Sequence, residues 1–183
     1  MITVGTLLTG RELLRPGWIE VSEAPHGTVA AIGAGDPPRP ADRDFGAATV
    51  VPGFVDTHVH GGGAANFSTA VTPETATAVA LHRRHGTTTL IASLVTAAPD
   101  ELLRQVTGLA ADVRDGLIGG IHLEGPWLST TRCGAHQPSL MRDPDPAEID
   151  RLLDAASGAI RMVTIAPERD GALAAIRQIV WIR

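Results

Sequence analysis

The chain has 183 residues, of which 44% are hydrophobic and 19% are charged, and its net charge is −5. This composition is typical of a globular protein and excludes disordered and collagen-like classes. The acidic balance, without any basic cluster, argues against nucleic acid or a membrane surface as a partner. Because the sequence contains no lysine, it also excludes a P-loop lysine, a Schiff-base lysine and a carbamylated-lysine metal bridge.

Targeting signals and disulfides are not expected. The N-terminal sequence MITVGTLLTG lacks the charged start and long apolar run of a signal peptide. No stretch reaches the roughly 18 apolar residues that a membrane span needs. The single cysteine excludes an internal disulfide and suggests a reducing compartment. We therefore expect a cytoplasmic protein.

Residues 1–50 are expected to form a small β unit. Short strands are predicted at Thr3–Thr9, Trp18–Ser22, Thr28–Ile32 and Ala48–Val51, separated by glycine and proline. The segment Gly35–Gly46 is rich in proline and charge, which predicts a connecting loop rather than a strand.

Residues 51–183 alternate between apolar runs and amphipathic helical patterns. Strands are predicted at Gly53–His60, Thr87–Val95, Leu117–Glu124 and Ile160–Ala166, and helices at Pro73–His85, Pro99–Arg114, Pro146–Ser157 and from Gly171 onward. Four successive β/α units give a parallel sheet, because such crossovers are right-handed. The pattern fits either an open doubly wound sheet or part of a (β/α)8 barrel.

The helix at Pro146–Ser157 carries the clearest start signal in the chain. Asp145 is predicted as its N-cap, Pro146 occupies the first helical position, and Glu148 stands where a capping box places its acidic residue.

The segment VPGFVDTHVHGGG ends an apolar strand with Asp56, His58 and His60. Side chains alternate along a strand, so these three are predicted to share one face at its carboxyl end, where α/β folds place active sites. Neutral imidazole is a good ligand for zinc, iron and related divalent ions. The alternative interpretation is a histidine pair at a solvated strand end.

The segment GGIHLEGPWLS repeats this geometry with His122 and Glu124. A carboxylate that faces inward beside an apolar strand is costly unless it is paired or binds a cation. Glu124 is therefore predicted to share a metal with His58 and His60. An ion pair between Glu124 and Arg132 or another arginine is the alternative.

The loop that follows, LSTTRCGAHQPS, contains Cys133 and His136 and is expected to contact substrate. Cys133 could be a nucleophile, but an ordinary loop thiol is favoured because no cysteine–histidine pattern surrounds it. His82 and His85 end a predicted helix and are interpreted as structural.

The motifs PGFVDTHVHG and HLEGPW, the GAH of the loop and the strand TIAPE together resemble the N-acetylglucosamine-6-phosphate deacetylases of the amidohydrolase superfamily. The resemblance extends over nearly the whole chain. It implies a metal-dependent (β/α)8 barrel preceded by part of a small β-sandwich, and a reaction that releases acetate from N-acetylglucosamine 6-phosphate. Another cyclic-amide hydrolase of the superfamily is the second candidate.

The resemblance also implies a set of site residues. Glu124, His58 and His60 match metal ligands for one or two divalent ions (Zn, Fe, Mn or Co), and Ala135 and His136 match contacts to the amino sugar phosphate. Cys133 matches a loop cysteine near the site in some members. The full-length form is expected to be a homodimer.

About 130 residues follow the β unit, whereas a (β/α)8 barrel typically takes about 250. We therefore expect the N-terminal half of the barrel. The resemblance implies that the catalytic aspartate and two later histidine ligands of the family fall beyond residue 183. The ending QIVWIR departs from the family pattern, which suggests a truncated product without deacetylase turnover on its own.

Overall fold

The computed structural model describes residues 1–22 and 27–181. The chain divides into two compact units, Met1–Gly53 and Phe54–Arg183. Among the described residues, no helix combines the length and apolar character needed to cross a bilayer.

The first unit consists of two small sheets. One has the order β5-β4-β1-β6 and the other β3-β2-β7. The strands are β1 (Ile2–Val4), β2 (Thr6–Leu8), β3 (Leu13–Leu14), β4 (Gly17–Val21), β5 (Val29–Ala34), β6 (Arg43–Asp44) and β7 (Thr49–Val50). Met1, Val4 and Leu7 are buried and provide the apolar centre of this unit.

Two predictions for this unit were wrong in detail. The predicted strand Thr3–Thr9 is two strands, β1 and β2, which belong to different sheets. Gly5 lies between them, where an added Cβ would be 2.8 Å from Ala47 Cα, so the backbones approach closely. The predicted loop Gly35–Gly46 contains β6, which pairs in parallel with β1. Only two of its residues pair, so the surrounding prolines do not prevent it.

The second unit is a four-stranded parallel sheet with the order β13-β12-β11-β8. Its strands are β8 (Phe54–Val59), β11 (Thr87–Val95), β12 (Gly120–Glu124) and β13 (Ile160–Thr164), and its helices are α1 (Thr72–Arg84), α2 (Pro99–Arg114), α3 (Pro146–Ala156) and α4 (Ala172–Trp181). A small hairpin, β9 (Gly61–Gly62) with β10 (Ala65–Asn66), and three short 3-10 helices at Phe67–Thr69, Thr130–Arg132 and Pro138–Leu140 complete it.

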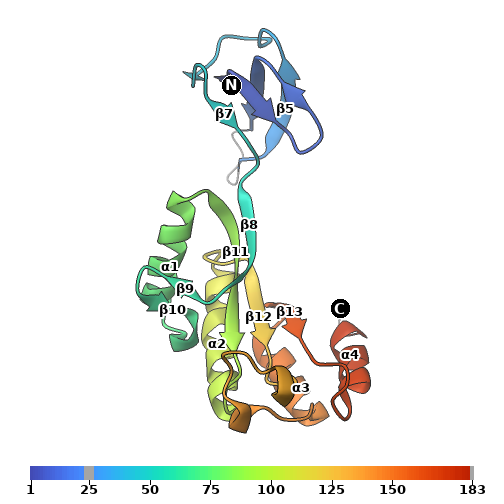
Figure 1. The fold of residues 1–183 in the computed structure, drawn as a ribbon. Helices are drawn as coiled ribbons and strands as arrows, with labels where there is room; N and C mark the ends of the chain where they lie inside the picture. The colour runs from blue at the N-terminus through green and yellow to red at the C-terminus, as the bar shows by residue number, and fades with distance from the viewer. Residues whose placement is uncertain (23–26, 182–183) are drawn as a thin grey trace. The chain divides into compact units, whose positions relative to one another are not determined.

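Each strand of the sheet leads into one helix, and successive helices pack beside one another (Figure 1). The α2 helix turns Leu102, Val106 and Leu109 inward, and all three are fully buried. They join Leu94 and Ile121 of the adjacent strands in the main apolar core. Because every strand runs in the same direction, all four carboxyl ends meet at one edge of the sheet. The four predicted β/α units are therefore confirmed.

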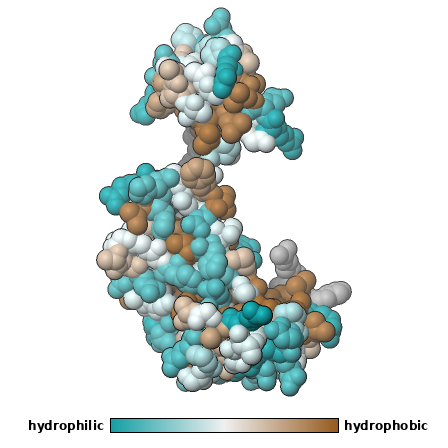
Figure 2. Space-filling view, viewed as in Figure 1, coloured by the Kyte–Doolittle hydropathy of each residue, from teal (hydrophilic) through white to brown (hydrophobic). Residues whose placement is uncertain are grey.

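A groove of about 940 Å³ lies beside β13, the last strand of the sheet. It is lined mainly by apolar side chains of α3, β13 and α4, including Leu153, Ile160, Met162, Ile176 and Ile179. Hydrophobic side chains gather over this part of the unit in Figure 2.

The start of α3 confirms one predicted feature and corrects another. Asp145 is the N-cap, and its Oδ1 accepts a 3.0 Å hydrogen bond from the Ala147 amide. Glu148 does not form the predicted capping box, because its carboxylate pairs with Arg142 instead. An ion pair with a guanidinium is stronger than a bond to one neutral amide.

Replacing Asp145 with alanine is expected to lower the free energy of unfolding by about 1 kcal/mol, since the helix loses its capping acceptor. Urea denaturation followed by circular dichroism measures the change. Asp154→Ala, near the other end of the same helix, is the control and should cause no loss, because a negative charge there opposes the helix dipole. Equal losses in the two variants would contradict the capping role.

Candidate metal centre

Three side chains converge at the carboxyl edge of the parallel sheet. His58 Nε2 lies 3.3 Å and His60 Nε2 lies 3.0 Å from the same oxygen, Glu124 Oε2. The two imidazole nitrogens are themselves 3.2 Å apart. Within the described residues these three form a group whose ligand atoms all lie within 4.8 Å of one another.

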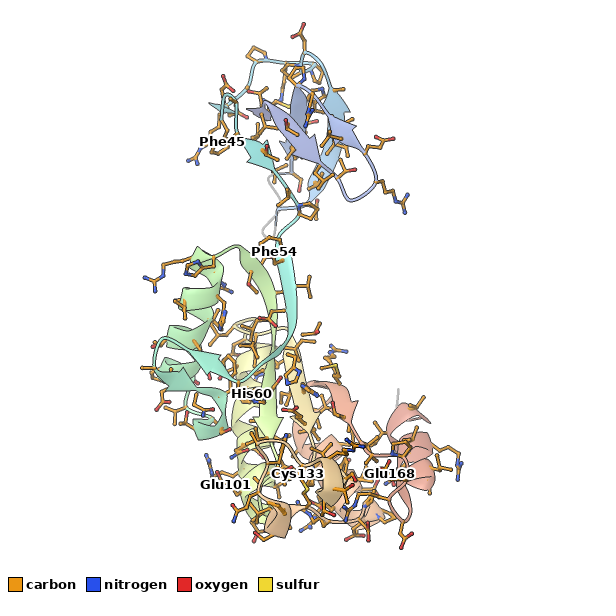
Figure 3. All side chains as sticks on the ribbon, in the orientation of Figure 1. Phe45, Phe54, His60, Glu101, Cys133 and Glu168 are labelled. Carbon is orange, nitrogen blue, oxygen red and sulfur yellow. The ribbon has the colours of Figure 1, made fainter. Side chains whose placement is uncertain are left out.

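Strand order and register bring the three together. His58 belongs to β8, and Glu124 is the last residue of β12. His60 follows the end of β8 (Figure 3). The β11 strand lies between β8 and β12. His58 and Glu124 therefore reach toward each other across the end of β11.

The donor atoms suit a divalent cation. With metal–nitrogen bonds of 2.0–2.1 Å, tetrahedral ligands are about 3.3 Å apart, close to the distances between these three atoms. Burial favours the neutral carboxyl of Glu124, but hydrogen bonding to His58 and the neighbouring imidazole charges outweigh this effect and place its pKa below the usual value. Glu124 is therefore ionised at neutral pH, as a metal ligand must be.

The backbone of β11 orients His60. Its Nδ1 lies 3.1 Å from the carbonyl oxygen of Ser93. A carbonyl only accepts hydrogen bonds, so Nδ1 carries the proton and the neutral ring presents a lone pair at Nε2. Metal-bound histidines generally have such a partner on the second nitrogen.

A buried polar layer lies next to the three ligand candidates. His122 is 1% exposed, and its nitrogens contact Ser93 Oγ at 2.9 Å and Thr164 Oγ1 at 2.8 Å. The His122 ring also meets the His58 ring edge to face, with centroids 4.9 Å apart. Burial, followed by the positive charge of His58, lowers the pKa of His122 to about 4. His122 is thus a neutral spacer between strands rather than a member of the ligand group.

This shifted pKa predicts a pH dependence of folding for the metal-free chain. The unfolded chain binds the His122 proton below about pH 6.5, whereas the folded chain binds it only near pH 4. Neutral His122 therefore contributes fully to the free energy of unfolding above pH 6.5. This contribution, of up to about 3 kcal/mol, is lost as the pH falls toward 4. Urea titrations across this range measure it. His122→Gln should flatten the profile relative to the control His85→Gln, and equal slopes in the two variants would contradict the prediction.

The loop after β12 carries His136 beside the three ligand candidates. His136 Nε2 lies 3.6 Å from Glu124 Oε2, and the side chain is only 9% exposed. Arg142 holds the far end of this loop, donating to Ala97 O at 2.8 Å and Leu140 O at 2.9 Å and pairing with the buried Glu148.

The other predicted residues differ in their placement. Cys133 lies in the same loop as a half-buried free thiol (Figure 3), and Ala135 is exposed. Asp56 is not in the ligand group. Its carboxylate accepts the backbone N–H of His58 at 3.1 Å. The alternative ion pair with Arg132 is replaced by contacts from Glu124 to three histidines.

Sequence reasoning missed the hydroxyl residues Ser93, Thr96 and Thr164, which hydrogen-bond to His122 and His136. The available signal was a polar residue near the carboxyl end of an apolar strand. His82 is structural as predicted, since its Nε2 lies 2.9 Å from Gly61 O.

Comparison with known proteins identifies the class. The amidohydrolase family matches residues 49–180, and the chain belongs to that family. Its members share a TIM-barrel type of domain and generally depend on a divalent metal.

The chain is most informatively compared with sugar phosphate deacetylases. It is 72% identical, with a TM-score of 0.94, to a variant of the N-acetyl-D-glucosamine-6-phosphate deacetylase of Mycobacterium smegmatis solved in complex with N-acetyl-D-glucosamine-6-phosphate, covering 98% of this chain and 46% of that one. It is 33% identical to the N-acetylgalactosamine-6-phosphate deacetylase of Escherichia coli O157:H7, covering 94% of this chain and 47% of the relative. It is 30% identical to the N-acetylglucosamine-6-phosphate deacetylase of Vibrio furnissii, covering 93% of this chain and 44% of the relative. The chain thus spans about half the length of these relatives.

Proposed function

We propose that the chain is the N-terminal part of an N-acetylglucosamine-6-phosphate deacetylase, which converts its substrate to glucosamine 6-phosphate and acetate. The convergence of His58, His60 and Glu124 at the carboxyl edge of the sheet carries this proposal. The likeness to the M. smegmatis enzyme supports the choice of substrate. The second unit is then the first half of a (β/α)8 barrel, and the first unit is part of a β-sandwich.

His58, His60 and Glu124 would hold one or two divalent ions, with zinc, iron, manganese and cobalt all suited to imidazole and carboxylate ligands. Such an ion polarises an amide carbonyl and lowers the pKa of a bound water. Glu124 supplies the negative charge, and the hydrogen bond to Ser93 O keeps Nε2 of His60 free of its proton.

The loop residues Ala135 and His136 are assigned to the sugar phosphate, with Cys133 as a further contact. His136 is the best placed of the three, because its Nε2 faces the ligand group from a buried position. The proton-transferring aspartate of the family is expected outside these 183 residues. The homodimer and the cytoplasmic location remain predictions.

A chimaera tests the function. Residues 1–183 would replace the matching segment of the M. smegmatis enzyme, and acetate release from N-acetylglucosamine 6-phosphate would be measured with and without EDTA. We expect metal-dependent release that is lost when Glu124→Gln is introduced. A folded, metal-loaded chimaera that releases no acetate, or one unaffected by Glu124→Gln, would overturn the proposal.

A further inference from the structure

His60 and His136 both turn Nε2 toward Glu124, and both use Nδ1 to contact the backbone near the end of β11. His60 Nδ1 lies 3.1 Å from the Ser93 carbonyl oxygen, whereas His136 Nδ1 lies 3.3 Å from the Thr96 amide nitrogen. The two rings therefore approach the same group of atoms with opposite backbone partners.

These partners impose opposite proton positions. A carbonyl can only accept, so His60 is protonated at Nδ1 and has a lone pair at Nε2. A backbone N–H can only donate, so Nδ1 of His136 must be the acceptor and its proton resides at Nε2. A ring nitrogen must lose its proton before it can bind a metal. In His136 the Nε2 proton cannot move to Nδ1, because Nδ1 faces the backbone N–H of Thr96.

Thr96 reinforces this arrangement with its side chain. Its Oγ1 lies 3.0 Å from the same Nδ1 of His136, so two donors of one residue meet one acceptor. Thr96 is 6% exposed, which leaves little water to compete. Gly125 provides the space: it has φ +88°, and a Cβ there would lie 2.4 Å from Thr96 Oγ1. Packing against Thr96 thus explains why a glycine occupies position 125 in the HLEGPW segment.

We propose that Thr96 is a positioning residue that fixes His136 as the tautomer with a proton on Nε2. His136 then presents a hydrogen-bond donor beside the metal ligands and is not itself a ligand. A donor at this position suits an oxygen atom of the bound sugar phosphate. The identity of this hydrogen-bond acceptor rests on the proposed function, which the inference deepens.

Nitrogen-15 NMR of histidine-labelled chain tests the proposal directly. At a pH where the rings are neutral, we expect His136 to show a protonated Nε2 and an unprotonated Nδ1. After loading with ¹¹³Cd²⁺, nitrogen–cadmium coupling is expected at Nε2 of His58 and His60 but not of His136. Protonation of His136 at Nδ1, or cadmium coupling to its Nε2, would overturn the proposal.

Variants separate positioning from folding. Thr96→Ser keeps both donors and should leave the Nδ1 resonance of His136 in place, whereas Thr96→Val loses the hydroxyl and should shift it. An unchanged resonance in a folded Thr96→Val chain would overturn the assignment to Thr96. Gly125→Ala should cause the same kind of shift, because the new methyl displaces the Thr96 hydroxyl.

Zinc affinity provides a second readout. We expect His136→Ala to weaken zinc binding by no more than about tenfold and His60→Ala by more than about a hundredfold. Loss of a group outside the ligand shell typically weakens metal binding by about 10–100-fold, so these values are the lower and upper limits of that range. Comparable losses would overturn the proposal. Neither measurement involves substrate, so the expected tautomers with an inactive chimaera would overturn only the proposed function.

Discussion

Glu124→Gln is expected to weaken zinc binding by more than about a hundredfold, because even groups outside the ligand shell change affinity by 10–100-fold. The substitution preserves size and removes the charge shared by His58 and His60, whose Nε2 atoms lie 3.3 and 3.0 Å from Oε2. Isothermal titration of the metal-free chain with Zn²⁺ measures the loss.

Glu168→Gln is the matched control, since Glu168 is exposed and lies outside the ligand group. It changes the net charge of the chain by the same amount. If both variants bind zinc as tightly as the parent chain, the ion is held elsewhere and the candidate centre is wrong. Circular dichroism of each variant distinguishes lost ligation from lost folding.

Glu148→Gln is expected to lower the free energy of unfolding by about 3 kcal/mol. This is the lower end of the usual cost of leaving one partner of a buried ion pair uncompensated, because the Arg142 side chain is 23% exposed. Glu148 is 4% exposed, and the Arg142 guanidinium that it neutralises lies among the carbonyls of Ala97 and Leu140. Urea denaturation at neutral pH measures the change.

The exposed pair Glu101–Arg104 provides the control, with side chains 45% and 50% exposed. Glu101→Gln should cost no more than about 1 kcal/mol, because water screens surface ion pairs. If Glu148→Gln were equally mild, Arg142 would not be the anchor of the loop that carries His136.

The parallel sheet and the three residues of the candidate metal centre could be predicted because their signals are local. His58, His60 and Glu124 are polar residues at the ends of apolar strands, and glycines follow them closely. Alternation along a strand then predicts their common face. The N-cap at Asp145 was equally visible, because the residue type and the following proline point to one local conformation.

The supporting contacts could not be predicted because they depend on register between strands. Threonine is common in strands for steric reasons, so the position of Thr96 and Thr164 near strand ends did not indicate their specific roles beside His136 and His122. Glu148 illustrates the converse: its local context favoured a capping box, but Arg142, six residues earlier, is the stronger partner.

The carbonyl that orients His60 belongs to the main chain, which has a practical consequence for mutational scanning. Every residue that can replace Ser93 keeps the same backbone C=O. A conventional alanine scan would therefore detect only the loss of the Ser93 hydroxyl and not the role of the carbonyl. Its influence on the imidazole would appear only when the peptide unit itself is altered, for example by ester substitution at the following bond. Part of the chemistry at this edge is therefore encoded in the path of the backbone and can persist while the side chain at position 93 varies.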